Sequence, residues 1–484
     1  MVLFRVKTED EGVNLLLDRK AFIGAAAAGI AGCRGFLPDL GGDGICGGKR
    51  WYRGMLHMHS LWSDGRAMPE QAIAAYKDIG YDFVSLTDHN RFQDDPDRWV
   101  GVGGSGKEPW PPKKLQDACY SAYMKRFGKT AAVRQKEGKT ELRLATYPEL
   151  KAMFEEPGRF LLLPGVEITT NANKIKGSTR AMHMNVIGIP GVSEELAKSP
   201  LIKPLSEHTA ASAIREFRER SEDFARSHDI ARPLCIVNHP HWVYYDIQAE
   251  DLVANPEIRF FEVCNNGTEW EVPEGMDAEW YNDKLWDVVN AHRFSRGQAP
   301  LYAVATDDTH FYPGTGIKYF AFGDGYIMVR ARSLDAESLF EAMNRGDFYA
   351  SSHLQLDDVA FDRGSGTLSV SVPAVEGTAF SIRFIVTRKG APLKPVRYVD
   401  IPAEGRRAGR ARSVAIYDDG VGATARLVRG GRSEGVSASY TLKGDDLYVR
   451  ARIESDRPSV YAEKRRLHPH TCTAWTQPYG HTRI

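Results

Sequence analysis

Cysteine, net charge and long apolar runs are all scarce in this chain, and each shortage argues against a class of protein. Six of the 484 residues are Cys and no two form a CxxC pair, so we expect neither a thiolate metal site nor a dense disulfide framework. Lys and Arg total 63, as do Asp and Glu, so no stable nucleic-acid complex is expected. No apolar run reaches the roughly 18 residues that would span a bilayer.

The composition is that of an ordinary globular protein, with 42% hydrophobic and 26% charged residues. A chain of this length exceeds a single core of usual size, so we expect one large domain and a smaller one.

Residues 1–33 resemble an export signal of the twin-arginine and lipoprotein types. Arg19 and Lys20 precede an Ala/Gly-rich stretch that ends in Ile-Ala-Gly-Cys33, which resembles a lipoprotein cleavage box. We therefore expect an exported protein, periplasmic or lipid-anchored at the cell envelope of a bacterium. Peripheral membrane attachment would run through Cys33, with residues 34–50 as a tether.

Two features of this segment count against that interpretation. Lys20 stands where a twin-arginine signal has its second Arg, and residues 9–11 are acidic. The alternative is a buried Ala-rich helix.

Residues 51–353 alternate apolar strand-like runs with helical patterns, which is typical of an α/β domain with parallel strands. Several of these runs end in His, Asp or Glu, and parallel barrels place their catalytic groups at the carboxyl ends of strands. A Lys- and Arg-rich insertion at about 95–156 is predicted to be helical and to cover one side of the site, although a solvated excursion is the simpler interpretation. Residues 354–484 show short alternating strands between Gly-rich turns and predict a smaller β-sandwich-like domain.

The chain contains three HxH pairs, of which the first is the most informative. His57 and His59 end a strand-like run, where alternation directs both imidazoles to one side. The second pair, His239 and His241, is separated by a proline, so both rings are not expected to face one metal ion. The third, at residues 468–470, has no acidic neighbours and is interpreted as unrelated.

Further motifs follow the first pair in order along the chain. They are Ser63-Asp64-Gly65, Thr87-Asp88-His89-Asn90, Gly165-Val166-Glu167, His183, Asn238-His239-Pro240 and Asp307-Asp308-Thr309-His310. Together they resemble the PHP (polymerase and histidinol phosphatase) superfamily of metal-dependent hydrolases. Within it, three further segments look most like the carbaryl-hydrolase-like (CehA/McbA) group: Glu262-Val263-Cys264-Asn265, Leu285-Trp286-Asp287 and Phe348-Tyr349-Ala350-Ser351-Ser352.

The resemblance implies a distorted (β/α)7 barrel that holds two or three divalent ions. It assigns His57, His59, Glu167 and Asp308 to the first ion, and His183, His239 and the bridging Glu167 to the second. It assigns Asp64, His89 and His310 to the third. Neutral imidazoles and carboxylates suit Mn, Zn or Fe, and carboxylates can bridge two ions.

Each ligand also has a simpler interpretation. Taken apart from the other motifs, Glu167 is explained as a carboxylate in a turn and His183 as a buried core histidine. Asp88 and Asp307 are predicted to orient ligand imidazoles from behind. His241 and Trp242 are candidates for a substrate-facing wall.

The implied chemistry is hydrolysis by a metal-bound hydroxide, with Glu167 as the bridging ligand and His310 or Asp64 passing a proton to the leaving group. A phosphoesterase acting on a nucleotide, oligonucleotide or other small phosphate ester is the first hypothesis. Hydrolysis of a carboxylic or carbamate ester is the second, favoured by the aromatic residues Trp62, Phe92, Trp99 and Trp242. A surface glycan-binding module on an inert scaffold is the third.

Overall fold

The computed structural model of the chain describes residues 48–104, 114–169, 182–189, 209–240, 247–267, 278–313, 322–401, 412–458 and 471–480. The expected export signal and the tether up to residue 47 lie outside these residues, as do His241 and Trp242. No helix among the described residues is long and apolar enough to cross a membrane.

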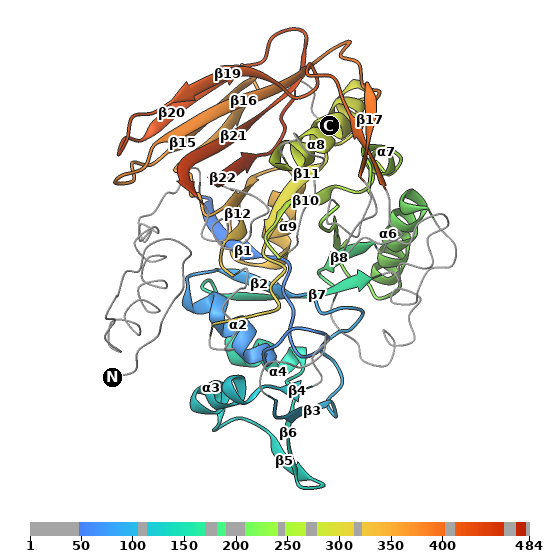
Figure 1. Cartoon of the computed structure of the whole chain (residues 1–484), viewed down its shortest axis with the longest axis vertical. Helices are drawn as coiled ribbons and strands as arrows, with labels where there is room; N and C mark the ends of the chain where they lie inside the picture. The colour runs from blue at the N-terminus through green and yellow to red at the C-terminus, as the bar shows by residue number, and fades with distance from the viewer. Residues whose placement is uncertain are drawn as a thin grey trace, which may run out of the picture. The chain divides into compact units, whose positions relative to one another are not determined.

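A thirteen-stranded sheet organises the structure (Figure 1). Its strand order is β11-β10-β9-β8-β7-β2-β1-β12-β13-β22-β21-β16-β19. Six strands of its first part run in the same direction: β1 (Arg50–Met55), β2 (Phe83–Leu86), β7 (Leu161–Thr169), β9 (Leu234–Val237), β10 (Phe260–Asn265) and β11 (Tyr302–Thr306). Their carboxyl ends therefore share one edge of the sheet.

One strand inside this series runs the other way. β8 (His183–Ile187) is antiparallel to both β7 and β9. A simple reversal therefore places the first residue of β8 at the edge where its neighbours end.

The predicted closed barrel is not confirmed, because the sheet stays open at β11. β12 (Gly325–Ala331) already pairs with β1 on one side and with β13 (Phe348–Ser352) on the other, so it has no free edge for β11. Instead, the backbone carbonyl of Thr306 in β11 lies against Gly325, where a Cβ would collide with it. The strand at one end of the sheet, β11, thus approaches β12 closely without forming a hydrogen-bonded ladder with it.

Helices pack along this sheet. They are α2 (Pro69–Asp78), α6 (Ala210–Ser227), α7 (Ala249–Val253), α8 (Ala278–Ser295) and α9 (Ala336–Asn344). Side chains fix two of their first turns, since Thr209 accepts a hydrogen bond from the backbone of Ser212 and Asp335 accepts one from Ser338.

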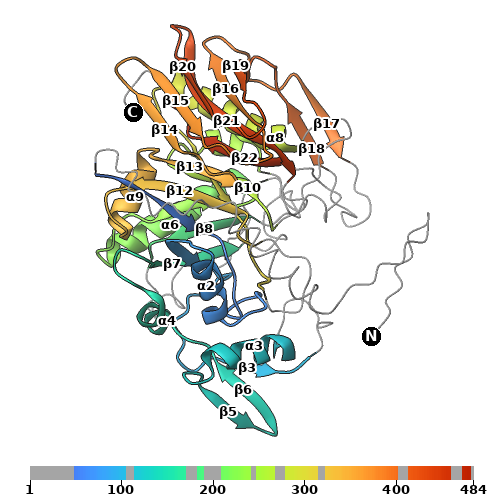
Figure 2. The ribbon, with the colours of Figure 1, turned by 90° about the vertical axis from the view of Figure 1, so that its left-hand side faces the viewer.

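The insertion is a mixture of helix and sheet, which differs from the helical excursion that was predicted. It contains α3 (Asp117–Phe127), α4 (Tyr147–Phe154) and a four-stranded sheet of β3 (Trp99–Val102), β4 (Lys114–Leu115), β5 (Val133–Lys136) and β6 (Lys139–Arg143). Glu137 and Gly138 have φ of 51° and 73°, the two positive values that a tight hairpin turn requires. Figure 2 shows the resulting β5–β6 hairpin beside α3.

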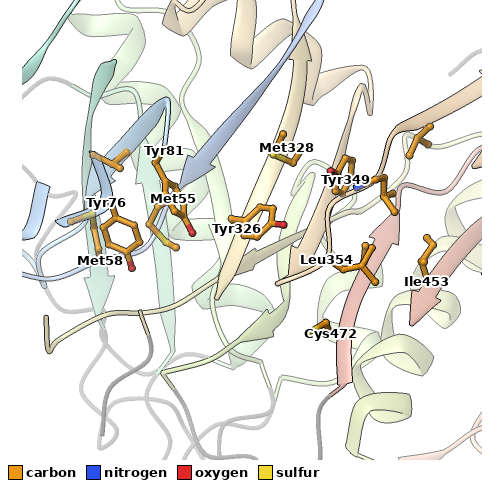
Figure 3. Packing of buried hydrophobic residues seen from close by; sticks show 14 of the residues in the cluster. Met55, Met58, Tyr76, Tyr81, Tyr326, Met328, Tyr349, Leu354, Ile453 and Cys472 are labelled. Atoms are coloured by element: carbon orange, nitrogen blue, oxygen red, sulfur yellow. Dashed lines mark hydrogen bonds between the residues drawn. The ribbon is translucent and has the colours of Figure 1, made fainter. Parts of the chain in front are cut away.

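Four of the C-terminal strands extend the main sheet, and the others form two small sheets. β22 (Thr471–Thr476), β21 (Asp446–Pro458), β16 (Phe380–Arg388) and β19 (Ala423–Arg429) continue it beyond β13. A separate three-stranded sheet of β14 (Asp358–Asp362), β15 (Thr367–Val372) and β20 (Val436–Thr441) shares a core with them, and β17 (Arg397–Ile401) pairs with β18 (Arg412–Ile416). In Figure 3 this core runs from Met55 and Tyr81 through Tyr326 to Ile453 and Cys472.

The other face of β21 packs against α8, and the side chains buried between them are charged. Arg450 and Arg452 have exposed fractions of 0% and 1%, and they pair with Asp287 and Asp283 of the helix at 2.6 and 2.7 Å. Alternation along β21 thus gives one apolar face and one face of buried ion pairs.

Candidate metal centre

The shared edge of the sheet brings together all nine side chains that the sequence predicted as metal ligands. His57 and His59 follow β1, His89 follows β2, Glu167 lies in β7, His183 begins β8, His239 follows β9, and Asp308 and His310 follow β11. Asp64 lies in the loop after His59. Backbone hydrogen bonds tie these segments together, because His59 donates to Thr309 O at 2.9 Å and Asn90 donates to Glu167 O at 2.8 Å.

Four overlapping groups of these residues have ligand atoms close enough to hold a cation. They are His59-Asp64-His89-His310, His57-His59-Asp308, His57-Glu167-His239 and His89-Glu167-His183. The grouping resembles the predicted assignment, except that three histidines also join groups expected for other ions. His59 joins the group of Asp64 and His310, His57 joins that of His239, and His89 joins that of His183. The structure therefore supports a connected cluster more than three separate sites.

Glu167 lies at the centre of the cluster. Its Oε1 is 2.9 Å from His183 Nδ1 and 3.3 Å from His57 Nε2. Its Oε2 is 2.9 Å from His89 Nδ1 and 3.3 Å from His59 Nε2. His239 Nε2 also lies 3.4 Å from Oε1. The two carboxylate oxygens thus face different sets of imidazoles, which suits a bridging carboxylate.

Asp308 is the second shared carboxylate. Its Oδ1 is 3.0 Å from His59 Nε2 and 3.2 Å from His57 Nε2. Its φ is 49°, and that of His239 is 24°, a backbone region that side chains other than glycine rarely adopt. Such strain is characteristic of functional sites, where the surrounding structure enforces it.

Several buried polar atoms of the cluster fit a bound cation. Among the described residues, His57 Nε2, both ring nitrogens of His59, Glu167 Oε2 and Asp308 Oδ1 make no hydrogen bond. Burying polar atoms without a hydrogen-bond partner is costly, and all of these atoms belong to residues of the four groups. Imidazole nitrogen and carboxylate oxygen form the donor set that Zn, Mn or Fe prefers.

The charges of the side chains also favour a cation. Burial would raise the pKa of Glu167, but His183 and His89 hold it well below its usual value. Burial would likewise raise the pKa of Asp308, and His57 outweighs that effect. Both central carboxylates are therefore ionised at neutral pH.

Exposure is graded across the cluster. The side chains of His57, His59, Glu167 and His239 are at most 1% exposed. Those of His89, His310 and Asp64 are 23%, 17% and 12% exposed. The cluster is closed at its base and open at this rim, and an open position is typical of catalytic rather than structural metal sites.

Asp88 and Asp307 lie behind the cluster, but they hold loops rather than imidazoles. Asp88 accepts hydrogen bonds from the backbone and hydroxyl groups of Ser60 and Ser63 at 2.8–3.2 Å, which fixes the loop that carries Asp64. Asp307 accepts hydrogen bonds from the backbone of Gly323, Asp324 and Gly325 and from Tyr76. The role predicted for both, orientation of ligand rings, is thus replaced by support of the segments beside the site.

Residues that do support the ligands were missed at the sequence level. Glu262 Oε1 lies 2.7 Å from His57 Nδ1, Asn238 Nδ2 donates to Glu167 Oε1 at 2.8 Å, and Thr169 Oγ1 lies 2.7 Å from His89 Nδ1. Glu262 offered one signal, since it is an acid within the apolar run of β10.

No family model and no curated protein matches the chain. A two-domain protein from Bacteroides vulgatus that contains a predicted PHP-like metal-dependent phosphoesterase is 15% identical, with 84% of this chain and 91% of that chain covered and a TM-score of 0.35. A protein from Bifidobacterium adolescentis named as a metal-dependent phosphoesterase is 11% identical, with coverage of 60% and 95% and a TM-score of 0.30.

An amidohydrolase from Chromobacterium violaceum, with bound sulfate and no metal, is 13% identical, with coverage of 55% and 90% and a TM-score of 0.24. Similarities of this size do not establish a common fold. We therefore infer the function from the residues of the site itself.

Proposed function

We propose that this protein is a metal-dependent hydrolase of the PHP type that cleaves phosphate esters with two or three divalent ions. The observation that carries the proposal is the cluster around Glu167 and Asp308, which is buried at its base and partly exposed at His89, His310 and Asp64. A purely structural metal site would have no reason to keep such an open rim.

Ions held by this cluster would lower the pKa of a water molecule and neutralise negative charge on the substrate. The residues at the base of the cluster would hold and orient these ions. Glu167 and Asp308 offer shared carboxylates, and His57 and His59 offer imidazoles that are fixed by burial.

Residues at the rim are placed to handle a proton. His310 Nε2 lies 3.2 Å from Asp64 Oδ1, while His310 Nδ1 donates to the backbone oxygen of Asp308 at 2.9 Å. This hydrogen bond leaves Nε2 as the atom that faces Asp64 and the exposed side. With only two ions bound, a proton could pass between this pair and the leaving oxygen of a substrate. A third ion would instead take Nε2 and Asp64 as ligands.

Phosphate esters are the preferred substrate class for two reasons. A cluster with several charge centres matches the several oxygens of a phosphoryl group. Two of the four aromatic residues that would favour a carbamate are also buried, since Trp62 is 1% exposed with Nε1 donating to Ala145 O, and Phe92 is 4% exposed. Neither side chain is available to line an open site.

The test is a substrate panel on the purified protein, reconstituted with Mn, Zn or Fe. We expect hydrolysis of bis-p-nitrophenyl phosphate or p-nitrophenyl phosphate, with inhibition by a chelator. Turnover of a naphthyl carbamate alone would replace the phosphoesterase with the carbamate hydrolase. Bound metal without turnover of any ester would favour the binding-module hypothesis.

A further inference from the structure

One buried carboxylate outside the predicted ligand set accepts hydrogen bonds from four different groups. Glu262, on β10, has an exposed fraction of 0%. Its Oε1 lies 2.7 Å from His57 Nδ1 and accepts a hydrogen bond from Thr306 Oγ1 at 2.6 Å. Its Oε2 accepts hydrogen bonds from the backbone N of His239 at 2.7 Å and from Asn265 Nδ2 at 2.8 Å.

These contacts demand a carboxylate rather than an amide. Two of the groups approach each oxygen, and the backbone N–H of His239 and the amide of Asn265 can only donate at Oε2. A glutamine would place its own NH2 group against these donors if its oxygen faced His57, or against the donors at Oε1 if it were flipped. The first orientation leaves buried donors without an acceptor, which is costly. The second is satisfied only if the proton of His57 moves from Nδ1 to Nε2, the nitrogen that faces the cluster.

The contact with His57 also decides which ring nitrogen faces the cluster. Because a carboxylate accepts, His57 Nδ1 carries the proton and donates it to Glu262. Its Nε2 then presents a lone pair between Glu167 Oε1 at 3.3 Å and Asp308 Oδ1 at 3.2 Å. A carboxylate behind a ligand imidazole fixes its tautomer and raises its basicity.

The same carboxylate reaches a second ligand segment. It holds the backbone of His239, whose φ is 24°, and it shares Asn265 Nδ2 with Asp308 Oδ2, which lies 3.3 Å away. Glu262 therefore connects the segments after β1, β9 and β11, each of which carries a predicted ligand.

We propose that Glu262 is a positioning residue that sets the affinity of the cluster for the ion held by His57. The proposal rests on the proposed metal-dependent function. Glu262 does not itself join the ligand set, because its oxygens are occupied by the four donors. It fixes the direction of the His57 ring and the backbone of His239, and it adds negative charge behind them.

The test is Glu262→Gln, with Glu257→Gln as a matched control at an exposed position of the loop before β10. Affinities for Mn²⁺ and Zn²⁺ are measured by chelator competition, with the number of bound ions counted by mass spectrometry. We expect Glu262→Gln to weaken the affinity of one ion by roughly 10- to 100-fold, with the remaining ion or ions less affected. Glu257→Gln should bind like the wild type.

A measurement on the wild type covers the case in which Glu262→Gln does not fold. In metal-loaded protein labelled with ¹⁵N-histidine, the His57 ring, assigned by its loss in His57→Gln, should carry its proton on Nδ1. A proton on Nε2 would overturn the proposal, as would an unchanged affinity in a folded Glu262→Gln variant. Wild-type protein that binds no ion would instead overturn the proposed function, which separates the two failures.

Discussion

Replacement of Glu167 by Gln tests the centre of the cluster with almost no change in shape. The side chain contributes to two of the four groups that can hold a cation, and its Oε1 faces three imidazoles while its Oε2 faces two. Asn238 Nδ2 donates to Oε1, so the retained oxygen of Gln should stay at that position. The new NH2 group then replaces Oε2, beside His59 and His89, and cannot bind a cation there.

We expect Glu167→Gln to lose at least one bound ion and to lose about 4 kcal/mol of transition-state stabilisation, or about 10³-fold in kcat/KM. The assay combines metal counting by mass spectrometry with hydrolysis of bis-p-nitrophenyl phosphate. Glu156→Gln is the control, because Glu156 is an exposed acid whose only described ion pair is with Lys77 at the surface. Full metal content and full activity in Glu167→Gln would refute the assignment of Glu167 as the bridging ligand.

Three further predictions concern other parts of the protein. Arg450→Leu leaves Asp287 buried without its partner and should cost about 3–5 kcal/mol of unfolding free energy in urea; a change below about 1 kcal/mol would contradict the role of this ion pair. Burial lowers the pKa of His57 and of His89, but nearby carboxylates outweigh it and raise both pKa values well above the usual one, so the stability they add to chelator-treated protein should fall as pH rises above about 6.5. Melting temperatures from pH 6 to 9 should therefore decline without metal and separate increasingly from those of metal-loaded protein, whereas parallel curves would contradict this. If Cys33 is lipidated, Cys33→Ala should move the protein from the membrane fraction to the soluble fraction of the producing cells, and an unchanged distribution would argue against the anchor.

The candidate site was predictable because its residues follow a simple local rule. Apolar runs such as those of β1 and β2 end directly in His57 and His89, and strands that run in one direction bring such ends to one edge. His183 obeys the same rule in reverse, since β8 is antiparallel and begins where its neighbours end.

Features that depend on distant partners were not predictable in the same way. Closure of a barrel depends on whether β12 has a free edge, which local sequence does not encode. Arg450 and Arg452 alternate with apolar residues and therefore resemble a solvated face, yet α8 supplies Asp283 and Asp287 to cover them. Glu262 was missed as a functional residue because its four donors come from segments far apart in the chain.

Local composition misled the interpretation of the insertion. Its many Lys, Arg and Glu residues are good helix formers, and they favoured a helix through Arg143. The turn at Glu137 and Gly138 instead folds the segment back on itself, and β6 then joins the sheet of the insertion through β3.

The most direct test of the central claim is anomalous X-ray diffraction from crystals of protein loaded with Mn or Zn, recorded at the absorption edge of the metal. The predicted result is two anomalous peaks within the cluster that share Glu167 as a ligand, with any third peak beside Asp64, His89 and His310. Peaks located elsewhere, or no peak at metal concentrations that saturate hydrolysis, would show that these nine side chains do not form the metal centre.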